Sequence, residues 1–218
     1  EIGGSPLVVV GDALPQKALS AGRAARGWYT EMFRAGSRRS GAYDVSIVYC
    51  GASHHTMPVG LRERLNFGRG LDRAVAAARA LPSVDEAVVV STCNRAEVYV
   101  SAADGALSDR DLVAWLAAFH DLEIGVVEPC VVGARDADAA RHLFRVAAGL
   151  ESLVTGEPQI LGQVKAAYSN AVQQQATGPV LNRMFHWAFL AGKRARHETA
   201  IAEGAVSVSS AAAALARE

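Results

Sequence analysis

The 218-residue sequence has few cysteines, no long apolar run and no excess of charge, and each absence narrows the class of protein. Its three cysteines, Cys50, Cys93 and Cys130, are an odd number without a CxxC pair, which argues against a disulfide framework or a zinc site. No stretch of about 18 consecutive apolar residues occurs, so no membrane-spanning helix is predicted. Half of the residues are hydrophobic and 22 Lys and Arg balance 22 Asp and Glu, a composition typical of a globular protein with a sizeable core.

Nucleotide-binding motifs are also missing. No Gly-x-Gly-x-x-Gly follows an expected strand and no Gly-x-x-x-x-Gly-Lys-Ser/Thr occurs, so these residues encode no nucleotide-binding fold. Basic residues exceed acidic ones in residues 1–43 and 141–218, whereas acidic residues exceed basic ones in 44–140. This division permits contact between the C-terminal third and a polyanion, although solvated helix faces give the same pattern.

Residues 45–134 alternate strands and helices in the order βαββαβ. Runs rich in β-branched residues predict strands over 45–52, 86–92, 96–102 and 129–132. Apolar residues at helical spacing predict helices over 59–66, 71–81 and 112–119, and Ser108 suits the N-cap of the last. This order is that of the ferredoxin-like split βαβ arrangement, an α+β sandwich of a four-stranded sheet with two helices on one face.

After residue 134 the sequence is helical almost throughout. The signals are Asp136 or Asp138 as an N-cap, Gly149 as a left-handed terminator, Pro158 in a first turn, and Gly178-Pro179 before a third helix. We therefore divide the chain into an N-terminal extension with one helix (1–43), a ferredoxin-like subdomain (44–134), a helical part (135–204) and the start of a further Ala- and Ser-rich helix (205–218).

Cys93 is a candidate for chemistry because of its position. The apolar run Val88–Val90 opens into the polar residues Ser91-Thr92-Cys93-Asn94-Arg95, and the ends of strands are places where catalytic groups occur. A thiol reacts as its thiolate, which a neighbouring cation such as Arg95 favours. The alternative is a small buried hydrophobe, which is the interpretation we expect for Cys50 and Cys130 because they lie inside apolar strands.

Histidines offer further candidates. His142 lies one turn into a helix beside a core stripe that includes Leu143 and Leu150, where it can be an acid, a base, an orienting group, or a capping or surface residue. His54 and His55 are adjacent, so their side chains are expected to diverge and no metal site is predicted.

Two polar segments can either bind a ligand or serve the fold. Segment 149–159 contains two glycines, a hydroxyl, a carboxylate and an amide, although Glu157 before Pro158 also suits a helix N-terminus. Lys193, Arg194 and Arg196 lie toward the end of a helix expected over 180–198, where they suit phosphates or the helix dipole.

Taken in order, these segments resemble the N-terminal part of glutamyl-tRNA reductase from about Val45 to Ala216. The matching stretches are Gly51–Val59 (GASHHTMPV), Ser91–Tyr99 (STCNRAEVY), His142–Val154 (HLFRVAAGLESLV), Gly156–Lys165 (GEPQILGQVK), Gly192-Lys193-Arg194 and Gly204–Ala212 (GAVSVSSAA). The resemblance makes residues 205–218 the start of the family's linking spinal helix.

The resemblance implies a thiol mechanism. Cys93 would attack the ester that joins glutamate to tRNA and form a thioester, which NADPH would reduce to glutamate-1-semialdehyde, a tetrapyrrole precursor. It implies that His142 is an active-site residue, as orienting group or as acid and base. Arg95 would offer a bidentate fork to the glutamate carboxylate. The substrate-binding residues that it implies are Thr92, Asn94, Arg95, Ser152, Glu157 and Gln159.

The family continues past the spinal helix into a Rossmann-type NADPH domain and a dimerisation domain, so no cofactor site is expected in this chain. No metal is expected either. Alone, the chain is expected to be limited to acyl transfer or thioester hydrolysis. The resemblance implies glutamyl-tRNA as substrate, a homodimer for a full-length member, glutamate-1-semialdehyde aminotransferase as a partner, and a plastid stroma or bacterial cytoplasm. The alternative is a regulatory module that binds tRNA or protein without reductase activity.

Overall fold

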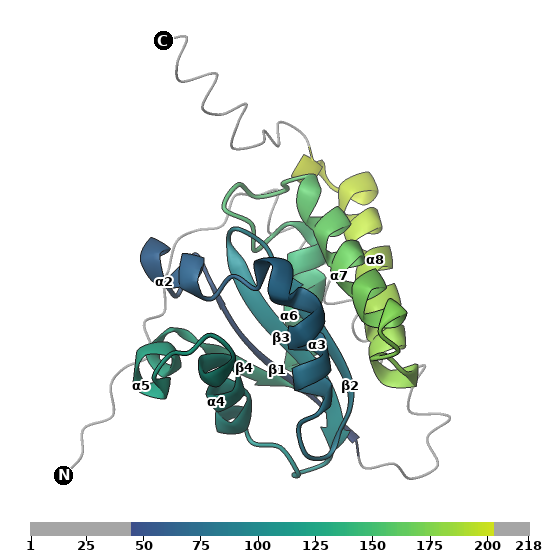
Figure 1. The fold of residues 1–218 in the computed structure, drawn as a ribbon. Coiled ribbons are helices and arrows are strands. Elements are labelled where there is room, and N and C mark those ends of the chain that lie inside the picture. The colour runs from purple at the N-terminus through teal and green to yellow at the C-terminus, as the bar shows by residue number, and fades with distance from the viewer. Residues whose placement is uncertain (1–44, 203–218) are drawn as a thin grey trace, which may run out of the picture.

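Four strands form one antiparallel sheet in the part of the chain that this computed structural model describes, residues 45–202 (Figure 1). They are β1 (Val45–Ser53), β2 (Val84–Ser91), β3 (Arg95–Ala103) and β4 (Val132–Arg135), in the spatial order β2-β3-β1-β4. Every neighbouring pair is antiparallel, so β1 and β2 run in the same direction with β3 between them. This is the split βαβ arrangement, which confirms the predicted ferredoxin-like fold.

Helices account for most of the other described residues. The ferredoxin-like part holds α2 (Val59–Arg64), α3 (Leu71–Arg79), α4 (Asp109–Phe119) and α5 (Ile124–Val127), and the helical part holds α6 (Asp136–Ala148), α7 (Gln159–Gln173) and α8 (Pro179–Glu198). Single 3-10 turns are η1 (Gly68–Gly70), η2 (Glu128–Cys130) and η3 (Ala200–Ala202). No helix within residues 45–202 is both long and apolar enough to cross a membrane. The predicted extension 1–43 and the further helix 205–218 lie outside the described residues.

Both faces of the sheet are covered, so β2 and β3 are buried almost throughout. On one face Tyr99 of β3 meets Phe185 of α8 with ring centroids 5.6 Å apart, and Tyr49 of β1 packs against His142 of α6 at 4.3 Å. The other face carries α3 and α4, the two helices of the ferredoxin-like unit (Figure 1). A strand covered on both faces carries apolar residues at consecutive positions, which explains the unbroken run Val88–Val90.

A buried carboxylate joins the sheet to α8. The Glu86 side chain on β2 accepts hydrogen bonds from the backbone N–H groups of Val180 (2.9 Å) and Leu181 (2.7 Å). These groups lie in the first turn of α8, where a helix lacks internal acceptors and attracts negative charge. A Cβ at Gly178 would lie 2.9 Å from Glu86 Oε1, so glycine is needed at the predicted helix boundary.

The fourth strand begins later than predicted. The expected strand 129–132 is wrong, because Pro129 lies in the 3-10 turn η2 and β4 starts at Val132. Proline has no backbone N–H to donate to a sheet, and its fixed φ suits the first turn of a helix. Cys130 is half-buried in this turn, so its predicted place in a core strand is also wrong. Cys50 on β1 is fully buried, as predicted.

Helix capping follows the sequence at α4 but not at α6. Ser108 caps α4 as predicted: its hydroxyl accepts from Asp111 N (3.2 Å), and the Asp111 carboxylate accepts from Ser108 N (2.8 Å). The predicted capping by Asp136 or Asp138 is wrong, because α6 begins at Asp136 with no side-chain cap. The Asp136 carboxylate instead accepts a hydrogen bond from Ile47 N on β1 (2.8 Å), and Asp138 forms an ion pair one turn further along α6.

Candidate functional site

The Cys93 thiol lies in a tight turn between β2 and β3, and it is exposed. A hydrogen bond from Thr92 N to the Arg95 carbonyl (2.9 Å) closes the turn, and Thr92 Oγ1 accepts from Asn94 N (3.1 Å). The alternative interpretation of Cys93 as a buried core residue is therefore wrong. Its exposure results from the two strands ending on either side of it.

Neighbouring segments hold this turn in place. Arg62 of α2 donates a hydrogen bond to Asn94 Oδ1 (3.1 Å), and the Asn66 amide donates to the Thr92 carbonyl (3.3 Å). The backbone N–H of His54, just after β1, donates to the Asn94 carbonyl (2.9 Å). All three contacts come from residues 54–66, which follow β1, so this segment fixes the turn relative to the sheet.

A small cavity of about 40 Å³ lies beside the turn. It is lined by Thr92, Cys93, Asn94, Arg95, Ser152, Glu157, Gln159, Ile160 and Gln163. The predicted nucleophile and all six predicted substrate-binding residues therefore line one cavity, although they come from two segments more than 50 residues apart in the sequence. Ile160 and Gln163 of α7 also line it, and their ordinary helical pattern gives no signal of a site.

Segment 149–159, which forms one wall of this cavity, is shaped by its two glycines. Gly149 ends α6 with a φ of 80°, as predicted, and Gly156 has a φ of 84°. Gly156 N donates to the Gly149 carbonyl (2.9 Å), and a Cβ at Gly149 would lie 3.1 Å from Gly156 Cα. Arg196 of α8 then donates to the carbonyl of Glu157 (2.9 Å) and to the next carbonyl along the chain (3.0 Å).

The arginines of the basic cluster on α8 have partners within the protein. Arg196 is bound to the cavity wall, and Arg194 forms an ion pair with Glu198 (2.7 Å) four residues further on. Lys193 is exposed. For the two arginines these contacts favour the structural interpretation over phosphate binding.

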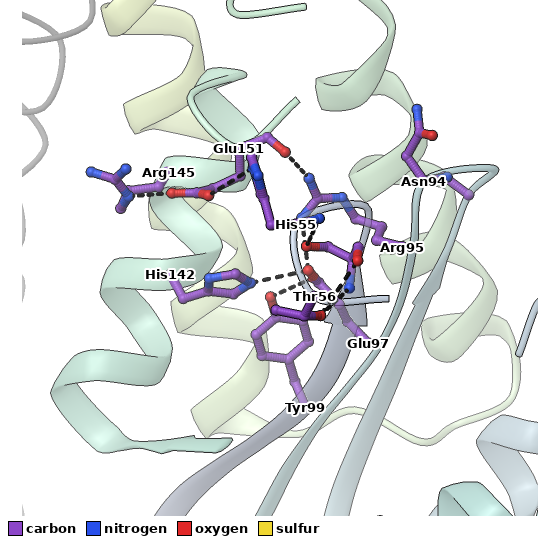
Figure 2. A network of polar contacts seen from close by, with 11 residues as sticks. His55, Thr56, Asn94, Arg95, Glu97, Tyr99, His142, Arg145 and Glu151 are labelled. Atoms are coloured by element: carbon purple, nitrogen blue, oxygen red, sulfur yellow. Dashed lines mark hydrogen bonds and ion pairs between the residues drawn. The ribbon is translucent and has the colours of Figure 1, made fainter. Parts of the chain in front are cut away.

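Arg95, which lines the cavity, forms a buried ion pair with Glu97 (Figure 2). Arg95 Nη1 donates to Glu97 Oε1 (2.7 Å), and Nη2 donates to the carbonyl of Glu151. Only 1% of the Arg95 side chain and none of the Glu97 side chain is exposed. Both ends of the fork that was expected to bind a substrate carboxylate therefore hold partners inside the protein.

Two polar atoms at the cavity are buried without a partner among residues 45–202. They are Arg95 Nε and Ser152 Oγ. A buried polar group that makes no hydrogen bond costs about 1–3 kcal/mol, and most such groups in native proteins do have partners. Both atoms are therefore hydrogen-bond donors without an acceptor among the described residues, in two side chains that line the cavity.

Glu97 accepts hydrogen bonds from both sides of the site. Besides Arg95, it accepts from the Tyr99 hydroxyl (2.9 Å) and contacts His142 Nε2 (3.0 Å). Burial alone would raise the pKa of Glu97, but the Arg95 charge and the His142 contact outweigh burial and lower it to about 2. Gly51 on β1 leaves room for this side chain, since a Cβ there would lie 2.8 Å from Glu97 Cγ.

His142 lines a second cavity of about 200 Å³ rather than the one that Cys93 lines. The second cavity is lined by Tyr49, Gly51, Ser53, His55, Thr56, Val132, His142 and Glu151. His142 is thus the one predicted site residue that the structure does not bring into the Cys93 cavity. Glu97 contacts both Arg95, which lines the first cavity, and His142, which lines the second (Figure 2).

The two adjacent histidines do not diverge as expected. The rings of His54 and His55 lie 3.9 Å apart, because β1 ends at Ser53 and both residues belong to the turn that follows. Burial, and to a smaller extent His55 and Arg95, lower the pKa of His54 to about 4. Within residues 45–202, no three His, Cys, Asp or Glu side chains are grouped so as to hold a metal ion.

Sequence reasoning misses two acidic residues of the site. Glu97 alternates with valines along β3, a pattern typical of a strand with one face in solvent, so its burial gives no signal. Glu151 holds Arg95 through its backbone carbonyl, which no residue type reveals. Its side chain accepts a hydrogen bond from Arg145 and lies 3.8 Å from His55 Nε2.

The fold and the site together define a ferredoxin-like α+β domain with an exposed thiol on a polar cavity that a helical unit completes. The family model described as "Glutamyl-tRNAGlu reductase, N-terminal domain" matches residues 50–199. The chain belongs to the glutamyl-tRNA reductase family, which confirms the resemblance.

Similar proteins agree with this assignment. The glutamyl-tRNA reductase of Syntrophotalea carbinolica is 47% identical over 178 residues, which cover 80% of this chain and 40% of that protein. The glutamyl-tRNA reductase of the cyanobacterium Picosynechococcus is 45% identical over 174 residues, which cover 79% of this chain and 41% of that protein. The solved structure of glutamyl-tRNA reductase from Methanopyrus kandleri matches with a TM-score of 0.62 and 37% identity, over 80% of this chain and 40% of that one. The chain thus spans about 40% of the length of its relatives.

Proposed function

We propose that Cys93 is the nucleophile that attacks the ester between glutamate and tRNA. In this step the Cys93 sulfur forms a bond to the ester carbonyl carbon and the ester C–O bond breaks. The electron pair of that bond leaves on the ribose oxygen of the tRNA, which takes up a proton in place of the one lost by the thiol. The protein then carries a thioester, which is more readily reduced than an ester.

The observation that carries this proposal is that the exposed Cys93 shares its cavity with Arg95 and Ser152, whose side chains each hold a buried donor, Nε and Oγ, without a partner among the described residues. A carboxylate accepts hydrogen bonds from donors of both kinds, and a hydrogen bond from a guanidinium is about twice as strong as one between neutral groups. We therefore propose that Arg95 binds the glutamyl carboxylate through Nε, since Nη1 and Nη2 already hold Glu97 and Glu151. The other polar groups proposed to bind the substrate are Thr92, Asn94, Glu157 and Gln159.

The remaining steps are proposed for a longer protein, because this chain spans about 40% of its relatives. Such a protein would be an oxidoreductase of tetrapyrrole biosynthesis that reduces the thioester with NADPH, forms a homodimer and passes glutamate-1-semialdehyde to an aminotransferase. Its compartment would be the bacterial cytoplasm or the plastid stroma. Residues 45–202 contain no glycine-rich dinucleotide motif and do not fit NADPH, so no step of the reduction is assigned to them.

The experiment is to mix the chain with tRNA that carries isotopically labelled glutamate, without NADPH, and to quench the mixture in acid. Peptide mass spectrometry then locates the label. We expect glutamate on Cys93, and none after Cys93→Ser. Cys130→Ser is the matched control, because this half-buried cysteine does not line the cavity and its removal should leave the adduct unchanged.

Cys50 serves as an internal control in every sample. Burial, with a smaller contribution from Asp109, raises the pKa of Cys50 to about 12, so its thiol should stay unlabelled. Label on Cys130, or label that persists after Cys93→Ser, would contradict the proposal. Binding of tRNA without any adduct would favour the regulatory module that binds without turnover.

A further inference from the structure

The hydrogen-bond pattern around Glu97 determines which nitrogen of His142 carries a proton. An ionised carboxylate only accepts hydrogen bonds, and the low pKa of Glu97 keeps it ionised at neutral pH. Its Oε1 atom lies 2.7 Å from Arg95 Nη1 and 3.0 Å from His142 Nε2, and its Oε2 atom lies 2.9 Å from the Tyr99 hydroxyl. His142 Nε2 must therefore donate, because an unprotonated nitrogen would place a lone pair against the carboxylate.

Nδ1, the other ring nitrogen of His142, is available to exchange a proton with a ligand. Nδ1 makes no hydrogen bond to any residue within 45–202, while the side chain is 25% exposed and lines the second cavity. Tyr49 packs against the imidazole with ring centroids 4.3 Å apart and so restricts its rotation. Figure 2 shows the ring directed at Glu97 from α6, across the space between helix and sheet.

We infer that Glu97 is a positioning residue that holds His142 in the Nε2–H form, so that Nδ1 is the nitrogen that exchanges a proton with a ligand in the second cavity. The same carboxylate fixes Arg95 at the Cys93 cavity, so Glu97 aligns both halves of the site. The inference rests on the proposed function for its chemical meaning: Nδ1, which carries no proton in the Nε2–H form, takes up the proton that the Cys93 thiol loses and passes it to the ribose oxygen that leaves during acyl transfer. The assignment of the tautomer does not depend on that step.

The groups that face His142 are consistent with this role. Glu97 and Tyr99 lie on β3, Tyr49 lies on β1, and His55 and Glu151 line the second cavity from the segments that follow β1 and α6. The Glu151 carboxylate is engaged by Arg145, and no hydrogen bond joins it to His142. Glu97 is thus the one acidic side chain among the described residues that is hydrogen-bonded to the imidazole.

The first test is the tautomer of His142 in the wild-type chain, measured from the ring ¹⁵N shifts and couplings of ¹⁵N-labelled protein above pH 7. His142→Asn identifies the signal by its disappearance. We expect the Nε2–H form, and an Nδ1–H form would overturn the inference. This measurement needs no substrate, so it stands even if labelled glutamate never reaches Cys93, a result that would refute only the proposed function.

The second test compares Glu97→Ala with Tyr99→Phe. Alanine removes the oxygen that His142 Nε2 contacts, so the Nε2–H form should no longer be favoured, whereas glutamine would still present an oxygen to both Arg95 and His142. Phenylalanine removes a hydrogen bond from the same carboxylate and leaves the His142 contact, so the tautomer should stay as in the wild type. If Glu97→Ala folds and keeps the wild-type tautomer, Glu97 does not position the ring.

The rate at which glutamate is transferred to Cys93 tests whether the positioning of His142 by Glu97 matters for the reaction. General acid–base catalysis contributes about 10²–10⁴-fold, so Glu97→Ala should slow single-turnover transfer by roughly 10²-fold or more. His142→Asn should also slow it, and the double variant should be slowed by less than the product of the two single effects, because both changes remove the same proton exchange while only the change at Glu97 also releases Arg95. Additive losses in the double variant would show that Glu97 acts independently of His142.

Discussion

Replacing Gly51 by alanine tests whether the space around Glu97 is as tight as the structure indicates. The new Cβ would lie 2.8 Å from Glu97 Cγ, 2.9 Å from the Tyr49 hydroxyl and 3.0 Å from Glu97 Cα. Carbon atoms in contact are ordinarily about 3.5–4.0 Å apart, so these atoms must move by roughly 0.5 Å or more. Glu97 Cα belongs to the backbone of the paired strand, and the Glu97 carboxylate is held by three hydrogen bonds.

The expected cost follows from two opposing effects. Overpacking of a filled core costs about 1–3 kcal/mol. Alanine is favoured over glycine within a strand by about 0.5–1 kcal/mol, which offsets part of that cost. We therefore expect Gly51→Ala to lower the free energy of unfolding by about 1–2 kcal/mol. We also expect slower acyl transfer to Cys93, because displacement of Glu97 disturbs both Arg95 and His142.

Urea denaturation measures the first effect, as a lower midpoint at unchanged slope, and the labelled-tRNA assay well below that midpoint measures the second. Gly133→Ala is the matched control on β4 of the same sheet, where the nearest atoms to a new Cβ are those of Asp109 at 3.4 Å. That change should be neutral or slightly stabilising. If Gly51→Ala is as stable and as active as Gly133→Ala, the argument from close packing at Glu97 is refuted.

Three further predictions concern stability. Ser108→Ala removes the N-cap of α4 and should lower the free energy of unfolding by about 1 kcal/mol in urea denaturation. An unchanged free energy of unfolding would show that the capping box does not stabilise the protein. Glu86→Gln weakens the contact with the first turn of α8 and should cost about 1–3 kcal/mol by the same method; a variant as stable as the wild type would contradict it. The pKa of Glu97 is lowered on folding, so its contribution to stability is present above about pH 4.5 and is lost as the pH falls toward about 2. Denaturation curves between pH 7 and pH 3 should show this loss, and a smaller pH dependence is expected for Glu97→Gln.

The strand and helix order was predictable because each element carries a local pattern. Period-2 and period-3.6 spacing, Ser108 and Gly149 give element types and several ends, and the order βαββαβ then leaves the split βαβ sheet as the natural topology. The fourth strand was misplaced because Val131 and Val132 resemble the end of a strand as much as its start. Pro129 decides between the two, since it cannot donate to a neighbouring strand.

The site was only partly predictable, because much of it depends on contacts distant in sequence. The Cys93 turn and segment 149–159 could be singled out from residue types, and the family resemblance assigned their roles. Glu97 could not be singled out from the sequence, because its burial depends on α6 and α8 covering that face of the sheet. Its partner His142 is also 45 residues away in the sequence. Glu86 likewise meets the start of α8 94 residues later, and no local pattern indicates that a strand carboxylate will cap a distant helix.

The buried charges at the site are poorly explained by stability alone. Replacing a buried ion pair by apolar residues of similar volume is often neutral or stabilising, so the Arg95–Glu97 pair is not needed merely to fill the core. Arg95 Nε and Ser152 Oγ are also buried without a hydrogen-bond partner among the described residues, and a buried polar atom without a partner costs about 1–3 kcal/mol. Under the proposed function, a substrate carboxylate in the Cys93 cavity would complete both sets of hydrogen bonds, and Glu97 would hold Arg95 in place for it. The proposal therefore accounts for stability given up at these atoms as preorganisation for binding in that cavity.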